Sequence, residues 1–155
     1  MIASPLQLAD FEAATLAYKR LEADPPPDDA EMGVGLSIEM DAEFDEERDV
    51  QRLQLDVRYN NEEDVPEEAA TYIAHRGHVR VTGWLHWASE EVAARDDAER
   101  LLLTNCLSML YGIARVRVAD LTADGRDQRL VLPSVNFRPA VQQWLEENDD
   151  KHSEA

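Results

Sequence analysis

The sequence predicts one α+β domain in which the strands of an antiparallel sheet come first and helices follow. Apolar residues recur with a period of two in residues 34–59 and 71–87, the pattern of half-buried strands. From residue 89 to about residue 122 they recur at helical spacing instead. The chain has 155 residues, which suits one domain, residues 1–148, followed by a flexible acidic tail at 149–155.

Three segments are predicted as strands, and the short loops between them favour antiparallel pairing with one face in water. The first is residues 34–44, which place six side chains on one side: Val34, Leu36, Ile38, Met40, Ala42 and Phe44. The second is residues 51–60, and the third is residues 71–87, where Gly77 and Gly83 indicate bends or bulges. Residues 5–23 fit either a helix or an edge strand.

The helical segment presents one apolar face, made by Leu102, Asn105, Cys106, Met109 and Ile113. Gly112 interrupts this segment and predicts its division into two helices, and a turn at 124–125 ends it. After an extended stretch, Asn136 is expected to cap a last helix that carries Val141 and Trp144 on one face.

The composition excludes several classes of protein. Thirty-three acidic residues against fifteen basic ones give a net charge of −18, which repels phosphate backbones and argues against nucleic-acid binding. No apolar run reaches the roughly 18 residues that cross a bilayer, and the first residues do not resemble a secretory signal. A single cysteine fits a cytoplasmic protein without a disulfide. Two lysines against thirteen arginines suit either a protein adapted to concentrated salt or an ordinary acidic protein from a GC-rich genome.

No pattern in the sequence indicates catalysis, a metal or a cofactor. His75 and His78 would point to opposite faces of one strand, and His86 would lie about 26 Å from His78, too far to share a zinc ion. Cys106 lies on the apolar helical face and is interpreted as a packed thiol. No phosphate loop or nucleophile motif occurs, so we expect a protein that is not an enzyme.

The last third of the chain carries four segments with a specific order and spacing. They are CLSML at 106–110, YGIARVRVADLTADG at 111–125, LVLPSVNF at 130–137 and PAVQQWL at 139–145. In this register, without a gap from residue 111, they resemble the SecB family of protein-export chaperones. Residues 21–23 and 76–81 match the first and last strands of that family more loosely. The sequence departs from the family at Gly112, where the family has a proline, and at Val141, where it has an aromatic residue.

The resemblance implies a fold, an assembly and a function. The fold is a four-stranded antiparallel sheet, with the N-terminal segment as first strand, followed by a long helix and a C-terminal helix. The assembly is a homotetramer, a dimer of dimers. The function is that of a holdase, a chaperone that binds unfolded clients without ATP and keeps them competent for export. The SecA translocase motor is then a partner, contacted through Glu22, although other matching positions hold Tyr18 and Ile73 instead of acidic residues.

Six residues are expected to bind clients in apolar grooves. Five match aromatic or apolar positions of the family's helical segments, and Phe44 is added from its place at a strand end. They are Phe44, Tyr111, Ile113, Phe137, Val141 and Trp144. Each of them also fits plain core packing. Two other functions stay open: an interaction module dedicated to one partner, such as an antitoxin, and a small enzyme whose site is assembled across subunits.

Overall fold

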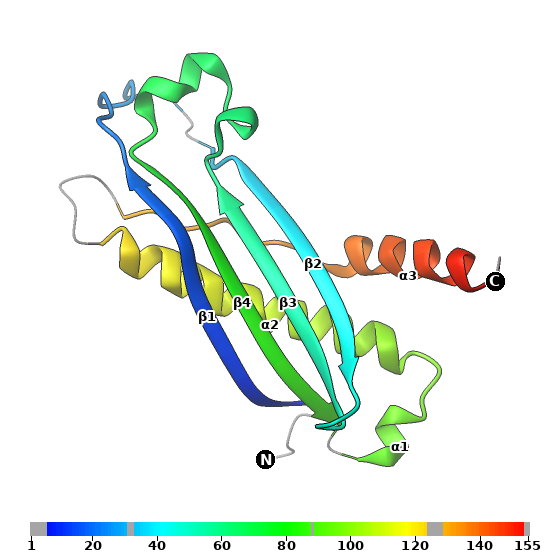
Figure 1. Cartoon of the computed structure of the whole chain (residues 1–155). Helices are drawn as coiled ribbons and strands as arrows, with labels where there is room; N and C mark the ends of the chain where they lie inside the picture. The colour runs from blue at the N-terminus through cyan, green and yellow to red at the C-terminus, as the bar shows by residue number, and fades with distance from the viewer. Residues whose placement is uncertain (1–5, 31–32, 88, 124–128, 154–155) are drawn as a thin grey trace.

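The computed structural model, which describes residues 6–30, 33–87, 89–123 and 129–153, has one four-stranded sheet with helices on one of its faces (Figure 1). The elements in chain order are β1 Leu6–Arg20, β2 Leu36–Asp45, β3 Val50–Tyr59, the 3₁₀ helices η1 Glu62–Asp64 and η2 Glu67–Tyr72, β4 His75–Trp87, α1 Glu90–Ala93, α2 Ala98–Leu121 and α3 Arg138–Ser153. This confirms the expected α+β fold.

The sheet has the strand order β1-β4-β3-β2, with every neighbouring pair antiparallel. The N-terminal segment, for which helix and strand were both open, is the edge strand β1. Its pairing with β4 shifts register twice, and these shifts break the regular alternation that marks a strand in a sequence. β4 begins at His75, four residues later than expected, because residues 67–72 form η2 directly after Pro66.

The core lies between the inner face of the sheet and α2. The helix crosses behind β4, β3 and β1 (Figure 1), and the fully buried side chains come from both layers: Leu53, Leu55, Val57, Val79, Val81, Leu85, Leu107, Leu110 and Val118. Gly83 allows α2 to lie close against β4, since a Cβ at this position would lie 2.7 Å from Cδ2 of Leu110. The alternation of β3 and β4 therefore buries one face of each strand against one helix.

α2 is one continuous helix, so the expected division at Gly112 was wrong. A Cβ on Gly112 would meet nothing within 4 Å, while the buried Tyr111 and Ala114 keep the helix packed on either side of it. By length and a mean hydropathy of 1.2, α2 would also pass for a membrane span, which the sequence expectation missed. Of that stretch, 44% is buried inside the protein.

α3 continues the chain away from the sheet. Residues 129–137 lead to it without regular structure. The Asn136 side chain, two residues before the first helical residue, accepts a hydrogen bond from the Arg138 N–H at 3.1 Å. The helix runs to Ser153, through most of the segment expected to be a tail. It packs on α2 near its start and then extends beyond the β2 edge (Figure 1). The turn expected at 124–125 lies outside the described residues.

Candidate functional site

An open groove, lined by apolar and polar side chains, lies at the end of the sheet where β2 ends. Phe44 from β2, Trp87 from β4, Leu102 from α2 and Trp144 from α3 line a hollow of about 380 Å³. A second hollow of about 760 Å³ shares Phe44, Trp87 and Leu102 with the first and continues towards α1. We call the two hollows together the Phe44 groove. Phe44 is 54% exposed, so its ring is available to a partner.

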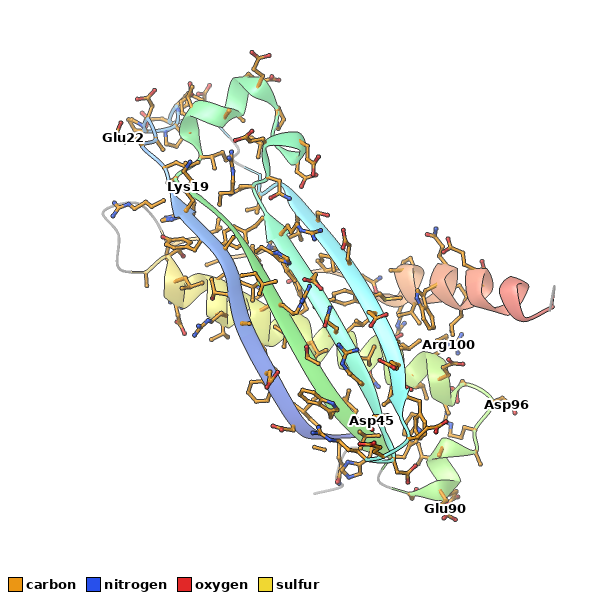
Figure 2. All side chains as sticks on the ribbon, viewed as in Figure 1. Lys19, Glu22, Asp45, Glu90, Asp96 and Arg100 are labelled. Carbon is orange, nitrogen blue, oxygen red and sulfur yellow. The ribbon has the colours of Figure 1, made fainter. Side chains whose placement is uncertain are left out.

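The rim of the Phe44 groove carries more acidic than basic groups. Its lining includes Glu99 on one side and Asp49, Glu90 and Arg48 on the other. Figure 2 shows further charged side chains at this end of the molecule, among them Asp45 and Asp96. A groove that combines large apolar side chains with an excess of acidic groups favours apolar segments that are flanked by basic residues.

Three of the predicted client-binding residues lie in the core and do not line the groove. The rings of Tyr111 and Phe137 meet edge to face, with centroids 5.6 Å apart, and Val141 is fully buried in the same cluster. The Tyr111 hydroxyl donates to the carbonyl of Pro133 at 2.8 Å. Burial raises the pKa of the Tyr111 phenol, and the positive charge of Arg115 offsets part of this rise. These residues fasten α3 and the segment before it to α2.

Ile113 lies apart from the Phe44 groove, in a second apolar surface. This surface, the β1–α2 patch, combines Phe11 and Ala13 of β1 with Met109, Gly112, Ile113 and Val116 of α2 around an open hollow of about 530 Å³. Its large side chains are well exposed: Phe11 is 48% and Val116 is 60% accessible. An exposed apolar surface of this kind is typical of an interface between proteins.

Glu22, the expected partner contact, is exposed just after β1. In Figure 2 it lies near Lys19 at the opposite end of the sheet from Asp45 and Glu90, which mark the end that carries the Phe44 groove. The structure therefore brings Phe44 and Trp144 together, gathers Tyr111, Phe137 and Val141 in the core, and leaves Ile113 and Glu22 at separate places.

Two titratable side chains with shifted pKa values, Cys106 and Asp56, belong to packed parts of the fold. Burial raises the pKa of the Cys106 thiol to about 12, so it stays protonated near neutral pH. On the outer face of the sheet, burial alone would raise the pKa of Asp56, but hydrogen bonds from Arg80, His78 and Gln54 outweigh this and lower it. Among the described residues, no three His, Cys, Asp or Glu side chains lie close enough to hold a metal ion.

Sequence reasoning missed several residues of both surfaces. Trp87 and Leu102 line the Phe44 groove, and Phe11, Met109 and Val116 make the β1–α2 patch. Leu102 and Met109 were recognised as members of an apolar helical face, but the sequence carries no signal that these parts of the face stay uncovered. The sequence did not indicate Phe11 as a surface residue of interest, because the register shifts of β1 break its alternation.

Comparisons with known proteins identify the fold. No protein-family model matches the sequence, and no curated protein matches it. Among solved structures, the chain is similar to the SecB-like chaperone Rv1957 of Mycobacterium tuberculosis in complex with a ChAD peptide from the HigA1 antitoxin. The two share 18% sequence identity and a TM-score of 0.51, over 84% of this chain and 91% of that one. The fold expected from the sequence resemblance is therefore confirmed as SecB-like.

Proposed function

We propose that this chain, which has a SecB-like fold, is an ATP-independent cytoplasmic chaperone that holds unfolded polypeptides in the Phe44 groove. The observation that carries the proposal is the groove itself, where Phe44, Trp87 and Trp144 come from three elements and line one open hollow. Clients that are kept unfolded in this way would stay competent for export.

The groove suits a holdase because its aromatic and aliphatic side chains offer contacts to apolar segments of a client. Burying one large apolar side chain contributes roughly 1.5–3 kcal/mol, so one groove binds weakly, and several grooves on one assembly gain by avidity when they hold the same client chain. Apolar burial is non-directional, which gives low sequence specificity. The net charge of −18 keeps a loaded complex soluble and favours basic clients.

The proposal includes assembly into a homotetramer, a dimer of dimers. The β1–α2 patch supports this, because it exposes Phe11, Met109 and Val116 on neighbouring elements and gives a second copy an apolar surface to cover. Glu22 lies at the other end of the sheet from the groove (Figure 2). A motor such as SecA could therefore contact Glu22 while a client occupies the groove.

A second candidate is a module dedicated to one polypeptide partner. It is favoured by the solved complex of the SecB-like chaperone Rv1957, whose bound peptide comes from an antitoxin. Such a module would bind its partner with saturable one-to-one affinity and have little effect on the aggregation of unrelated proteins.

Light scattering separates the two candidates. An unrelated protein is diluted from denaturant without nucleotide, with and without this chain, in low and in molar salt. We expect suppression of aggregation at about one assembly per client. A folded chain that fails to suppress aggregation in both salts would exclude general chaperoning and favour the dedicated module.

A further inference from the structure

The larger hollow of the Phe44 groove has two walls. One is the hairpin between β2 and β3, and the other is the segment that joins β4 to α2 and contains α1; both lie at the same end of the sheet (Figure 1). The hairpin contributes Arg48, Asp49 and Val50 to the lining, and the segment contributes Ser89, Glu90 and Ala93. We call residues 89–97 the α1 flap. The two walls differ in how firmly the rest of the fold holds them.

The hairpin wall is braced. The carboxylate of Asp45 accepts hydrogen bonds from the backbone N–H groups of Glu47 and Arg48, both at 3.1 Å. The guanidinium group of Arg48 lies over the Trp84 ring of β4, 5.5 Å from its centroid. Val50, where β3 begins, is only 9% exposed. The hairpin is therefore tied to the sheet, and this wall of the groove stays in place.

The α1 flap has little of this support. No residue of α1 is buried, and within this four-residue helix Val92 is half-buried while the others are exposed. The backbone hydrogen bonds of the described flap residues join them to one another or to the start of α2. A helix this short has almost no stability of its own. Segments with few buried contacts and exposed backbone hydrogen bonds open at the lowest cost in free energy.

The end of the α1 flap has the features of a hinge. The residues between α1 and α2 form a turn, and the ion pair of Arg95 and Asp97, at 2.9 Å, lies entirely within it. This pair ties the turn to no other element. Ala98, the first residue of α2, is 6% exposed and marks the point where the packed core begins. A rotation within the turn therefore moves α1 without disturbing α2.

The charges of the two walls make the position of the flap depend on what the groove contains. Glu90 lies on the flap and Asp49 on the hairpin, and Figure 2 shows Glu90 and Asp45 at the same end of the molecule. Like charges on facing walls oppose closure of an empty groove. A basic client segment between the walls removes this opposition, so that occupation of the groove itself favours closure.

We propose that the α1 flap is a lid of the Phe44 groove, open when the groove is empty and closed over a bound apolar segment that carries basic residues. Ala93, which lines both hollows, is the part of the lid that covers the client. The lid must open again before the client leaves, and this slows release. The inference rests on the proposed holdase function and adds how the groove retains a client.

Amide hydrogen exchange followed by NMR tests the movement. The probe is a ten-residue peptide of six leucines with two lysines at each end. The backbone N–H groups of Ala93 and Ala94 bond to the carbonyls of Ser89 and Glu90, inside the flap. In the free protein we expect both amides to exchange within about tenfold of an unstructured chain, and saturating peptide should slow them by at least about tenfold. Strong protection of both amides without peptide, or no change on binding, would overturn the lid.

A matched pair of variants tests closure over the client. Ala93→Asp and Ala94→Asp add the same charge to neighbouring exposed positions, and only Ala93 lines the groove. A carboxylate at position 93 would have to be buried against the client, so Ala93→Asp should abolish the gain in protection and speed peptide dissociation by at least about threefold. Ala94→Asp should leave the dissociation rate within about 1.5-fold of wild type. Equal effects of the two variants would show that added charge, and not closure, sets the rate.

The outcomes separate this inference from the function on which it rests. If the chain suppresses aggregation while the amides of Ala93 and Ala94 gain no protection, from the peptide or from a bound client, the lid is overturned and the holdase function stands. If the peptide protects these amides while the chain fails to suppress aggregation, the lid stands and general chaperoning is excluded.

Discussion

At the scale of single residues, exposure divides five of the six expected client-binding side chains into two roles, while the sixth, Ile113, lies in the β1–α2 patch. Tyr111, Phe137 and Val141 are buried and hold α3 on α2, whereas Phe44 and Trp144 line an open groove. A ring that is already buried in its own subunit has little apolar area left to offer a client. We therefore expect stability to depend on the first group and client binding on the second.

Phe137→Ala and Phe44→Ala should separate these roles. Removing the buried Phe137 ring should lower the free energy of unfolding by about 3–5 kcal/mol, because it leaves a cavity against Tyr111. Removing the exposed Phe44 ring should change it by less than about 1 kcal/mol. Urea denaturation followed by circular dichroism measures both values, and equal losses would contradict the division.

Asp56 predicts a pH dependence of stability. Hydrogen bonds from Arg80, His78 and Gln54 hold its folded-state pKa below the ordinary value, so the folded protein favours the ionised carboxylate. Its contribution to stability is fully present above the unfolded-state pKa of about 3.9, and it is lost as the pH falls from there through the folded-state pKa. Asp56→Asn should lower stability at pH 7 and remove this part of the acid sensitivity.

The measurement for Asp56 is the free energy of unfolding between pH 7 and pH 2 for the wild type and the variant. Glu12→Gln, which changes an exposed acidic residue of β1, serves as the control. The difference between wild type and Asp56→Asn should shrink below pH 4. A difference that stays constant down to pH 2 would show that Asp56 contributes by shape and not by charge.

At the scale of elements, Gly77 is the glycine of the described sheet with the least room for a side chain. A Cβ at this position would lie 2.4 Å from the Tyr59 hydroxyl and 2.6 Å from the carbonyl oxygen of Ala17. Both neighbours are held in place, since Tyr59 is fully buried and Ala17 belongs to the backbone of β1. A side chain at Gly77 must therefore push β1 or β3 away from β4.

Alanine substitutions at two glycines should have opposite effects. Gly77→Ala should lower the free energy of unfolding by about 1–3 kcal/mol, because it overpacks the sheet. Gly112→Ala adds a side chain where nothing lies within 4 Å, and it should raise that free energy by about 0.5–1 kcal/mol through better helix propensity. Urea denaturation checks both, and a stabilising Gly77→Ala would contradict the close contact.

The elements that could be predicted are those whose local pattern matches their burial. Alternation predicted β2 as residues 34–44 and β3 as residues 51–60, against Leu36–Asp45 and Val50–Tyr59 in the structure, because each strand has one side towards the core. β1 stayed undecided since two register shifts interrupt its pattern. The predicted division of α2 failed because a glycine that faces open space costs about 1 kcal/mol, which packing of the rest of the helix offsets.

The site was only partly predictable for a related reason. Phe44 was expected from its place at the end of a strand and Trp144 from the family resemblance, but their neighbours Trp87 and Leu102 come from two further elements. Which ends of apolar faces remain uncovered depends on how far α2 extends across the sheet and where α3 turns away. Neither feature can be predicted from the spacing of apolar residues along one segment of the sequence.

At the scale of the whole molecule, two apolar surfaces lie on different parts of the fold. The β1–α2 patch involves one edge of the sheet, and the Phe44 groove involves the end of the other edge strand, β2. One surface can therefore serve assembly while the other binds clients. The strongly negative charge opposes close approach of copies, so assembly should strengthen as salt screens it.

Val116→Asp should disrupt the assembly without unfolding the subunit. Val116 is 60% exposed in the β1–α2 patch, and a carboxylate there would have to be buried when a second copy covers the patch. Analytical ultracentrifugation should show a smaller species for the variant than for the wild type, and Val131→Asp, at an equally exposed site outside the patch, should not change the mass. An unchanged mass for Val116→Asp would place the interface elsewhere.

The central claim is that the Phe44 groove holds unfolded clients, and suppression of aggregation by a matched pair of variants tests it most directly. Phe44 and Val131 are 54% and 57% exposed, and only Phe44 lines the groove. Light scattering of an unrelated denatured protein, without nucleotide, is measured with the wild type, Phe44→Ser and Val131→Ser. We expect the wild type and Val131→Ser to suppress aggregation equally and Phe44→Ser to lose most of the effect. If all three suppress aggregation to the same extent, clients bind elsewhere and the claim is wrong.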